Sequence, residues 1–223
     1  MRLGSAILYL LFSTALLSPQ ETPQSGTAPP PRFPLDTVPA PTMKSVPASR
    51  LLLGNIKIIF DRTTLGQAME QIKAGEIRHQ GDAAESVYWL CYTNRTTTGW
   101  EQIWLLSHGE MGGDEHVIHG VAAKVSFSRP PESSCPVIPP NLRPVKLNNG
   151  LWLGAGTKEV IKKLGKPSFQ NENWLHYQSL RKLAGDPRAK AWGTDAMYER
   201  GGVSLDAADG KVVEIWATKQ TTD

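Results

Sequence analysis

The chain has 223 residues and a formal net charge of only +3, with acidic and basic residues interspersed along it. A chain without an extended basic field has no electrostatic reason to select polyanions, which argues against nucleic acid as a partner. Once an exported leader and a linker are set aside, about 175 residues remain, enough for one double module or two small domains.

The first 18 residues have the pattern of a secretion signal, because Arg2 precedes a short apolar run at 6–17. A membrane helix needs roughly 20 apolar residues, so this run is too short to span comfortably. We expect 1–18 to be a cleaved signal peptide of an extracytoplasmic protein, periplasmic or secreted, with an uncleaved membrane anchor as the alternative. A stable lipid anchor is not expected, because the only cysteines, Cys91 and Cys135, lie far from the cleavage point.

Residues 19–48 are rich in proline, with nine prolines in thirty positions and few large apolar side chains. Such a segment buries too little surface to offset its ordering entropy, which predicts a disordered tether that contributes nothing to the fold. Two alternatives remain open. In the first, the prolines bind in a groove of a partner protein. In the second, Phe33, Pro34, Leu35 and Val38 form an apolar latch that pairs with an exposed strand edge.

A first module is predicted at 49–128. Apolar residues alternate at 55–60, which indicates a strand, and Thr64 and Gln67 then have the spacing of a helix capping box. The apolar positions after Thr64 recur with helical period. Three further apolar runs are expected to form antiparallel strands, at 87–92, 100–106 and 117–127.

A proline-rich connector at 129–145 leads to a second module at 146–223. Its clearest element is a helix that starts with Thr157 as the cap and ends near Gly165. The expected inner face of this helix consists of Val160, Ile161 and Leu164. A strand at 174–177 and a hairpin that turns at 209–210 follow.

The two modules share a short pattern. Trp89-Leu90-Cys91-Tyr92 in the first matches Trp174-Leu175-His176-Tyr177 in the second. Each match follows a predicted helix and precedes a predicted pair of strands, which favours a repeat over chance similarity of strand composition. We therefore predict an α+β fold of two tandem modules, each with a short helical part packed on an antiparallel sheet.

The second module also resembles a known family. The run at 151–167 reads Leu-Trp-Leu-Gly-Ala-Gly-Thr-Lys-Glu-Val-Ile-Lys-Lys-Leu-Gly-Lys-Pro, and the Trp-Leu-His-Tyr pattern and the Asp209-Gly210 hairpin follow it. This order is similar to the small helix-plus-sheet module of the SmpA/OmlA outer-membrane lipoproteins and of the β-lactamase inhibitor proteins (BLIP-like). The first module has the same order but lacks the Leu-Gly-x-Pro helix stop.

The resemblance implies protein binding in the cell envelope or outside the cell, as an envelope scaffold or an inhibitor-like protein. Two modules in one secreted chain are closer to the inhibitor layout. The sequence departs from the lipoproteins by lacking the lipid-acceptor cysteine, and from the inhibitors by having too few cysteines for one disulfide in each module. The partner implied is another envelope or extracellular protein.

The cysteines and the tryptophans carry two further expectations, a disulfide and a binding surface. Cys91 lies in a predicted strand and Cys135 in the connector, and an exported chain permits a disulfide between them, the alternative being two separate thiols. Trp100 and Trp104 fall on one face of a predicted strand because their separation is even, and Trp174 lies in the corresponding strand of the second module. If these tryptophans face solvent, they are the expected anchors of an interface.

The loop from His108 to His119 contains three histidines and three carboxylates, residue types that bind zinc. Strand alternation puts His116 and His119 on opposite faces, so only His108 and His116 are placed to share an ion. A metal-dependent hydrolase that uses this loop is the alternative function. No nucleophile elbow, P-loop, dinucleotide fingerprint or His-Glu-x-x-His motif is present, so we expect neither an enzyme nor a cofactor.

Overall fold

The computed structural model describes residues 29–35, 37, 39–97, 99–109, 115–126 and 135–222. The expected signal peptide at 1–18 and the first ten residues of the expected tether lie outside this part of the chain. No helix in the described part is both long and apolar enough to cross a membrane.

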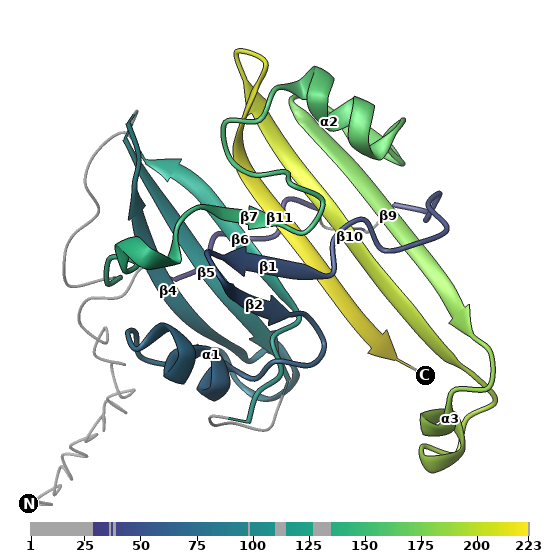
Figure 1. Cartoon of the computed structure of the whole chain (residues 1–223). Coiled ribbons are helices and arrows are strands. Elements are labelled where there is room, and N and C mark those ends of the chain that lie inside the picture. Colours follow the sequence, from purple (N-terminus) through teal and green to yellow (C-terminus); the bar gives the residue numbers. More distant parts are fainter. Residues whose placement is uncertain are drawn as a thin grey trace, which may run out of the picture.

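Two antiparallel sheets make up most of the molecule (Figure 1). The large sheet has the strand order β3-β4-β5-β6-β11-β10-β9-β8, and the small sheet has the order β2-β1-β7. The strands are β1 Arg50–Leu53, β2 Ile56–Ile59, β3 Arg78–Gln80, β4 Val87–Arg95, β5 Trp100–His108, β6 Gly120–Ser126, β7 Val145–Leu147, β8 Phe169–Asn171, β9 Trp174–Leu183, β10 Met197–Ala208 and β11 Lys211–Thr222.

The helices of the described residues are short: α1 Leu65–Ile72, α2 Thr157–Leu164 and α3 Pro187–Ala191, with 3-10 turns at Ala83–Glu85 and Pro140–Leu142. The predicted capping box of α1 is confirmed. The Thr64 hydroxyl accepts from the Gln67 amide at 3.2 Å, and the Gln67 side chain accepts from the Thr64 amide at 3.1 Å. For α2 the prediction was one residue off, because Gly156 is the N-cap and no side chain caps this helix.

The predicted α+β class is wrong, because the described chain is mostly β. Its three helices have eight, eight and five residues, whereas β10 and β11 have twelve residues each. The two predicted modules also do not have separate sheets. β6 pairs with β11 from Lys124 opposite Glu214 to Gly120 opposite Thr218, which joins both halves into one eight-stranded sheet.

The halves of the large sheet nevertheless run in the same order. α1 is followed by β3 to β6, and α2 by β8 to β11, and the two sets meet at β6 and β11. The shared Trp-Leu-x-Tyr pattern lies on β4 and β9, each second from its edge of the sheet.

One face of the large sheet carries the main core. Figure 1 shows the small sheet and α1 crossing this face. Side chains fully buried there come from both sheets and from α1, among them Leu51, Ile58, Leu65, Leu90, Ile103, Tyr177 and Val203. Because strand side chains alternate, the residues between these positions point to the second face, which is where the candidate site lies.

The proline-rich segment passes round the edge of the large sheet. The amides of Thr42 and Met43 both donate to the Gln178 carbonyl on β9, at 3.1 and 3.0 Å. Met43 forms a parallel bridge with Ser179, and Ala48 is fully buried in the main core. The predicted tether is thus ordered and packed where the structure describes its final residues, because β8 ends early and leaves the β9 backbone free to accept it.

Candidate protein-binding face

The second face of the large sheet carries an aromatic cluster. Its buried members are Trp89, Cys91, Trp104, Leu106, Ala122, Cys135 and Trp216, which come from four adjacent strands and the connector. Strand register explains the grouping. Cys91 lies opposite Trp104, Trp104 opposite Ala122, and Ala122 opposite Trp216, so one row of side chains crosses β4, β5, β6 and β11.

The next row of residues along the strands has small side chains at its centre. Leu106 lies opposite Gly120, Gly120 opposite Thr218, and Thr218 opposite Gly202, so small residues follow a large one. No larger side chain fits at position 120, since a Cβ there would collide with the Ala217 carbonyl. Beside this row lies a cavity of about 780 Å³, called here the trough, which is lined by residues of β3, β4, β5, β9, β10 and β11.

The proline-rich segment forms one wall of the trough. Pro30, Pro31, Arg32, Phe33 and Pro39–Pro41 all line it. The Phe33 ring meets the Trp216 ring edge to face, with centroids 5.4 Å apart and planes at 89°. Edge-to-face contact is a favourable arrangement of two aromatic rings. We call residues 29–49, where they are described, the strap.

The three tryptophans predicted as interface anchors differ in exposure. Trp104 is fully buried, and the Lys124 ammonium lies 5.5 Å from its ring centre. Trp174 is half-buried and packs against the aromatic cluster, and Trp100 is half-buried opposite Ser126. Trp104 and Trp174 therefore belong to one cluster, but Trp104 has no surface to offer a partner.

The sequence patterns did not identify four other large side chains on this face of the large sheet. Trp89, Leu106, Trp216 and Leu180 line the trough, and Leu180 is 41% exposed. Trp89 stands two positions before Cys91 on one strand, so its face was predictable by alternation. The position of Trp216 was not, because it depends on the long-range pairing of β6 with β11.

A disulfide joins Cys91 of β4 to Cys135 of the connector, with Cα atoms 5.0 Å apart. This is the pairing that the sequence allowed. Backbone hydrogen bonds continue the attachment, because the Thr93 amide donates to the Pro136 carbonyl and the Ile138 amide to the Thr93 carbonyl, both at 2.8 Å. The start of the connector is thereby fixed beside the aromatic cluster.

The histidines of the 108–119 loop separate onto two faces. His108 and His119 line the trough, and the His108 amide donates to the His119 ring at 3.4 Å. His116 instead lies next to Ser107, with Nδ1 3.3 Å from the hydroxyl, and stacks on Tyr88 at 4.0 Å. Because Ser107 and His108 are neighbours on β5, His108 and His116 point to opposite faces and do not share the space of one ion.

Burial lowers the pKa of His108, His116 and His119, which favours their neutral, metal-binding form. A zinc site still needs at least three protein ligands. The residues that the structure describes contain no group of three histidine, cysteine, aspartate or glutamate side chains placed to hold a metal ion. Glu110 and Asp114, counted among the candidate ligands, lie outside the described residues.

The buried His176 ring has two polar side-chain partners, the buried Ser204 and the exposed Asn171. Its Nδ1 lies 2.9 Å from the Ser204 hydroxyl and its Nε2 lies 2.9 Å from the Asn171 carbonyl oxygen. A serine, a histidine and an orienting amide in this order are arranged as in some nucleophilic enzymes. However, His176 is 0% and Ser204 1% exposed, so no substrate carbonyl reaches the hydroxyl. The arrangement ties β8, β9 and β10 together.

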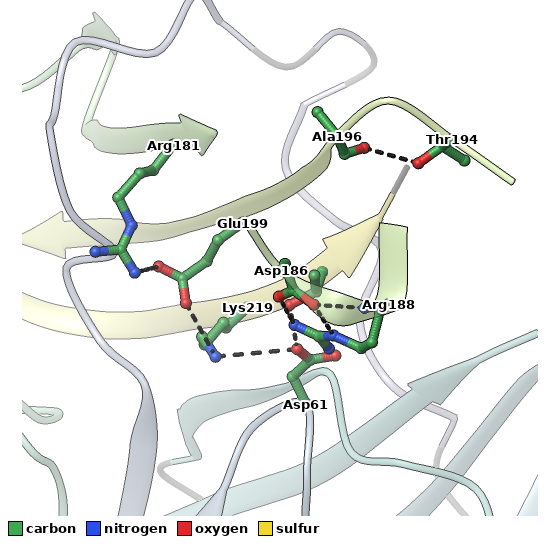
Figure 2. A network of polar contacts seen from close by, with 9 residues as sticks. Asp61, Arg181, Asp186, Arg188, Thr194, Ala196, Glu199 and Lys219 are labelled. Carbon is green, nitrogen blue, oxygen red and sulfur yellow. Dashed lines mark hydrogen bonds and ion pairs between the residues drawn. The ribbon is translucent and has the colours of Figure 1, made fainter. Parts of the chain in front are cut away.

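Figure 2 shows a polar network at the end of the sheet near α3. The Lys219 ammonium lies 3.2 Å from Glu199 and 3.9 Å from Asp61, and Glu199 also pairs with Arg181 at 2.8 Å. The Thr221 hydroxyl donates to Asp61 at 2.6 Å. Each charge here has an opposite neighbour, so the network ties the turn after β2 to β10 and β11 and offers no free charge to a ligand.

No family model matches the chain, and neither a curated protein nor a solved structure matches it.

Proposed function

We propose that this chain is an extracytoplasmic protein-binding module that uses the trough face of its large sheet. The observation that carries the proposal is the trough itself, a mainly apolar cavity of about 780 Å³ lined by Trp89, Leu106 and Trp216. These three side chains are 3%, 2% and 4% exposed, so a partner reaches them from inside the trough, where the strap now forms a wall. Aromatic side chains grouped around a hollow are the usual anchors of protein interfaces. Catalytic chemistry has no comparable support, because the one serine–histidine–amide arrangement described above is closed to solvent.

Two features support export. The leader at 1–18 has the pattern of a secretion signal, and the Cys91–Cys135 disulfide suits an oxidising compartment. An exported chain would meet other proteins of the envelope or the medium through the trough and the strap that forms one of its walls.

Site-specific photo-crosslinking in the native cells tests the proposal. A photo-reactive amino acid replaces Gln220, an exposed residue at the rim of the trough, in the full chain. The matched control carries it at Lys158, an exposed residue of α2. We expect a discrete protein adduct from position 220 and none from position 158. Equal labelling from both positions, or none from either, would contradict a binding role for this face.

A further inference from the structure

The trough is elongated, and its length indicates the shape of an occupant. Its lining runs from Gln80 on β3 to Leu180 on β9, which are separated by six strand-to-strand steps. At about 4.8 Å for each step, the trough is about 29 Å long. An extended peptide advances about 3.3 Å with each residue, so the trough matches about nine residues of extended chain.

The strap already shows one peptide on this surface. Its described prolines at 30, 31, 39 and 41 line the trough, and Phe33 provides the aromatic contact with Trp216. The strap does not fill the space, because the 780 Å³ cavity lies between it and the sheet. Gly120 has no side chain and its neighbour Thr218 is small, so no bulky side chain rises from the middle of this row. Gly202 is covered by the Gln178 side chain, which lines the trough.

Proline favours the extended polyproline conformation, and aromatic-lined grooves bind such segments at low entropic cost. We propose that the trough is a binding site for an extended peptide in which prolines flank an aromatic residue, and that the strap around Phe33 is its internal ligand. In this arrangement the partner presents a segment of the same chemistry, which displaces Phe33 from Trp216. The inference rests on the proposed function, whose binding face it shares.

The internal ligand competes with any peptide added from outside. A segment attached to the same chain has an effective concentration in the millimolar range, so it suppresses binding of a free peptide until its anchor is removed. Phe33→Ala removes that anchor and leaves the backbone hydrogen bonds of Thr42 and Met43 intact. The variant should therefore expose the site without unfolding the sheet.

The experiment uses the full chain and a fluorescent synthetic peptide with the sequence of residues 29–41, followed by anisotropy. We expect Phe33→Ala to bind the peptide about tenfold or more tightly than wild type does. A peptide with alanine in place of its phenylalanine should lose this binding. Equal affinity of the wild type and of Phe33→Ala, or equal affinity for the two peptides, would overturn the inference.

Two second-site changes localise the binding. Thr218→Glu, introduced into Phe33→Ala, puts a carboxylate on the half-buried trough floor and should abolish peptide binding. Lys57→Glu makes a charge change at an exposed position of β2 outside the trough and should leave the affinity unchanged. If Thr218→Glu keeps its thermal unfolding midpoint and still binds the peptide, the trough is not the site and the inference fails.

The outcomes also separate this inference from the proposed function. An adduct from position 220 without peptide binding to Phe33→Ala would overturn the peptide inference and leave the binding role of the face in place. Peptide binding without any adduct would support the inference as an internal contact and overturn the partner role. Failure of both experiments would remove both proposals.

Discussion

Tyr92 and Tyr177 make equivalent hydrogen bonds in the two halves of the large sheet. Tyr92 on β4 donates to the Ala74 carbonyl just after α1, at 3.0 Å, and Tyr177 on β9 donates to the Gly165 carbonyl just after α2, at 3.2 Å. Burial raises the pKa of both phenols, so both remain donors through the neutral range. Each tyrosine thus attaches its helix to the second strand from an edge of the sheet.

Removing either hydroxyl should destabilise the fold modestly. We expect Tyr92→Phe and Tyr177→Phe each to lower the free energy of unfolding by about 1 kcal/mol, the usual net contribution of one hydrogen bond. Tyr198→Phe is the control, because its hydroxyl makes no hydrogen bond with another described residue. Denaturant melts measure the difference. Losses equal to that of Tyr198→Phe would show that the two contacts do not stabilise the helices.

The inner face of α2 is narrower than the sequence predicted. Val160 is fully buried and Leu164 half-buried, whereas Ile161 is 47% exposed. Val160→Ala should therefore cost about 2 kcal/mol through lost burial and a small cavity. Ile161→Ala should cost less than about 0.5 kcal/mol, as exposed substitutions do. The reverse order in urea melts would mean that α2 is rotated about its axis.

The strap should contribute to stability, contrary to the prediction from its composition. Pro47 and Ala48 are buried, and two amides bond to Gln178. A chain that starts at Ser49 loses these contacts and should melt about 3 °C or more below one that starts at Pro29, since 1 kcal/mol shifts the midpoint of a chain of this size by about 2–4 °C. Identical midpoints in calorimetry would restore the view of a passive tether.

The stability of the fold should decrease in mild acid. Burial lowers the pKa of His176, so the fold holds its neutral form and the unfolded chain binds the proton more readily. This stabilisation is complete above the ordinary histidine pKa of about 6.5 and is lost as the pH falls through the lowered value. His108, His116 and His119 act in the same direction.

His176→Gln removes one of these titrating groups and keeps an amide that can bond to its neighbours. Between about pH 7.5 and pH 5, its unfolding free energy should fall less steeply than that of wild type, by at most about 1.4 kcal/mol per pH unit for one group. Urea melts at several pH values measure the slopes. Parallel slopes for the two proteins would show that His176 does not titrate on unfolding.

Local patterns predicted the local structure well. The capping box of Thr64 and Gln67, the antiparallel strands and the turn at Asp209-Gly210 are all present. The capping box and the turn depend on residues within a few positions of one another, and β4, β5 and β6 pair with their neighbours along the chain. The start of α2 was misplaced by a single residue, because Thr157 and Gly156 both suit a helix start.

The large-scale arrangement was not predictable in the same way. β6 and β11 are about ninety residues apart, and nothing local in either strand specifies the other as its partner. Without the pairing of β6 with β11, the row of side chains from Cys91 to Trp216 and the trough beside it would not form. The packing of the strap was not predictable for a related reason. Composition reports how little apolar area the segment has, but it does not reveal that the Gln178 carbonyl on β9 accepts hydrogen bonds from Thr42 and Met43.

Competition at the crosslinking position shows whether a partner binds in the trough. The full chain with the photo-reactive residue at position 220 is exposed to its native cell envelope with and without an excess of the peptide of residues 29–41. We expect the peptide to reduce the partner adduct in the Phe33→Ala background, and the peptide with alanine in place of phenylalanine to leave it unchanged. An adduct that persists unchanged with the first peptide would contradict the claim that a partner binds in the trough.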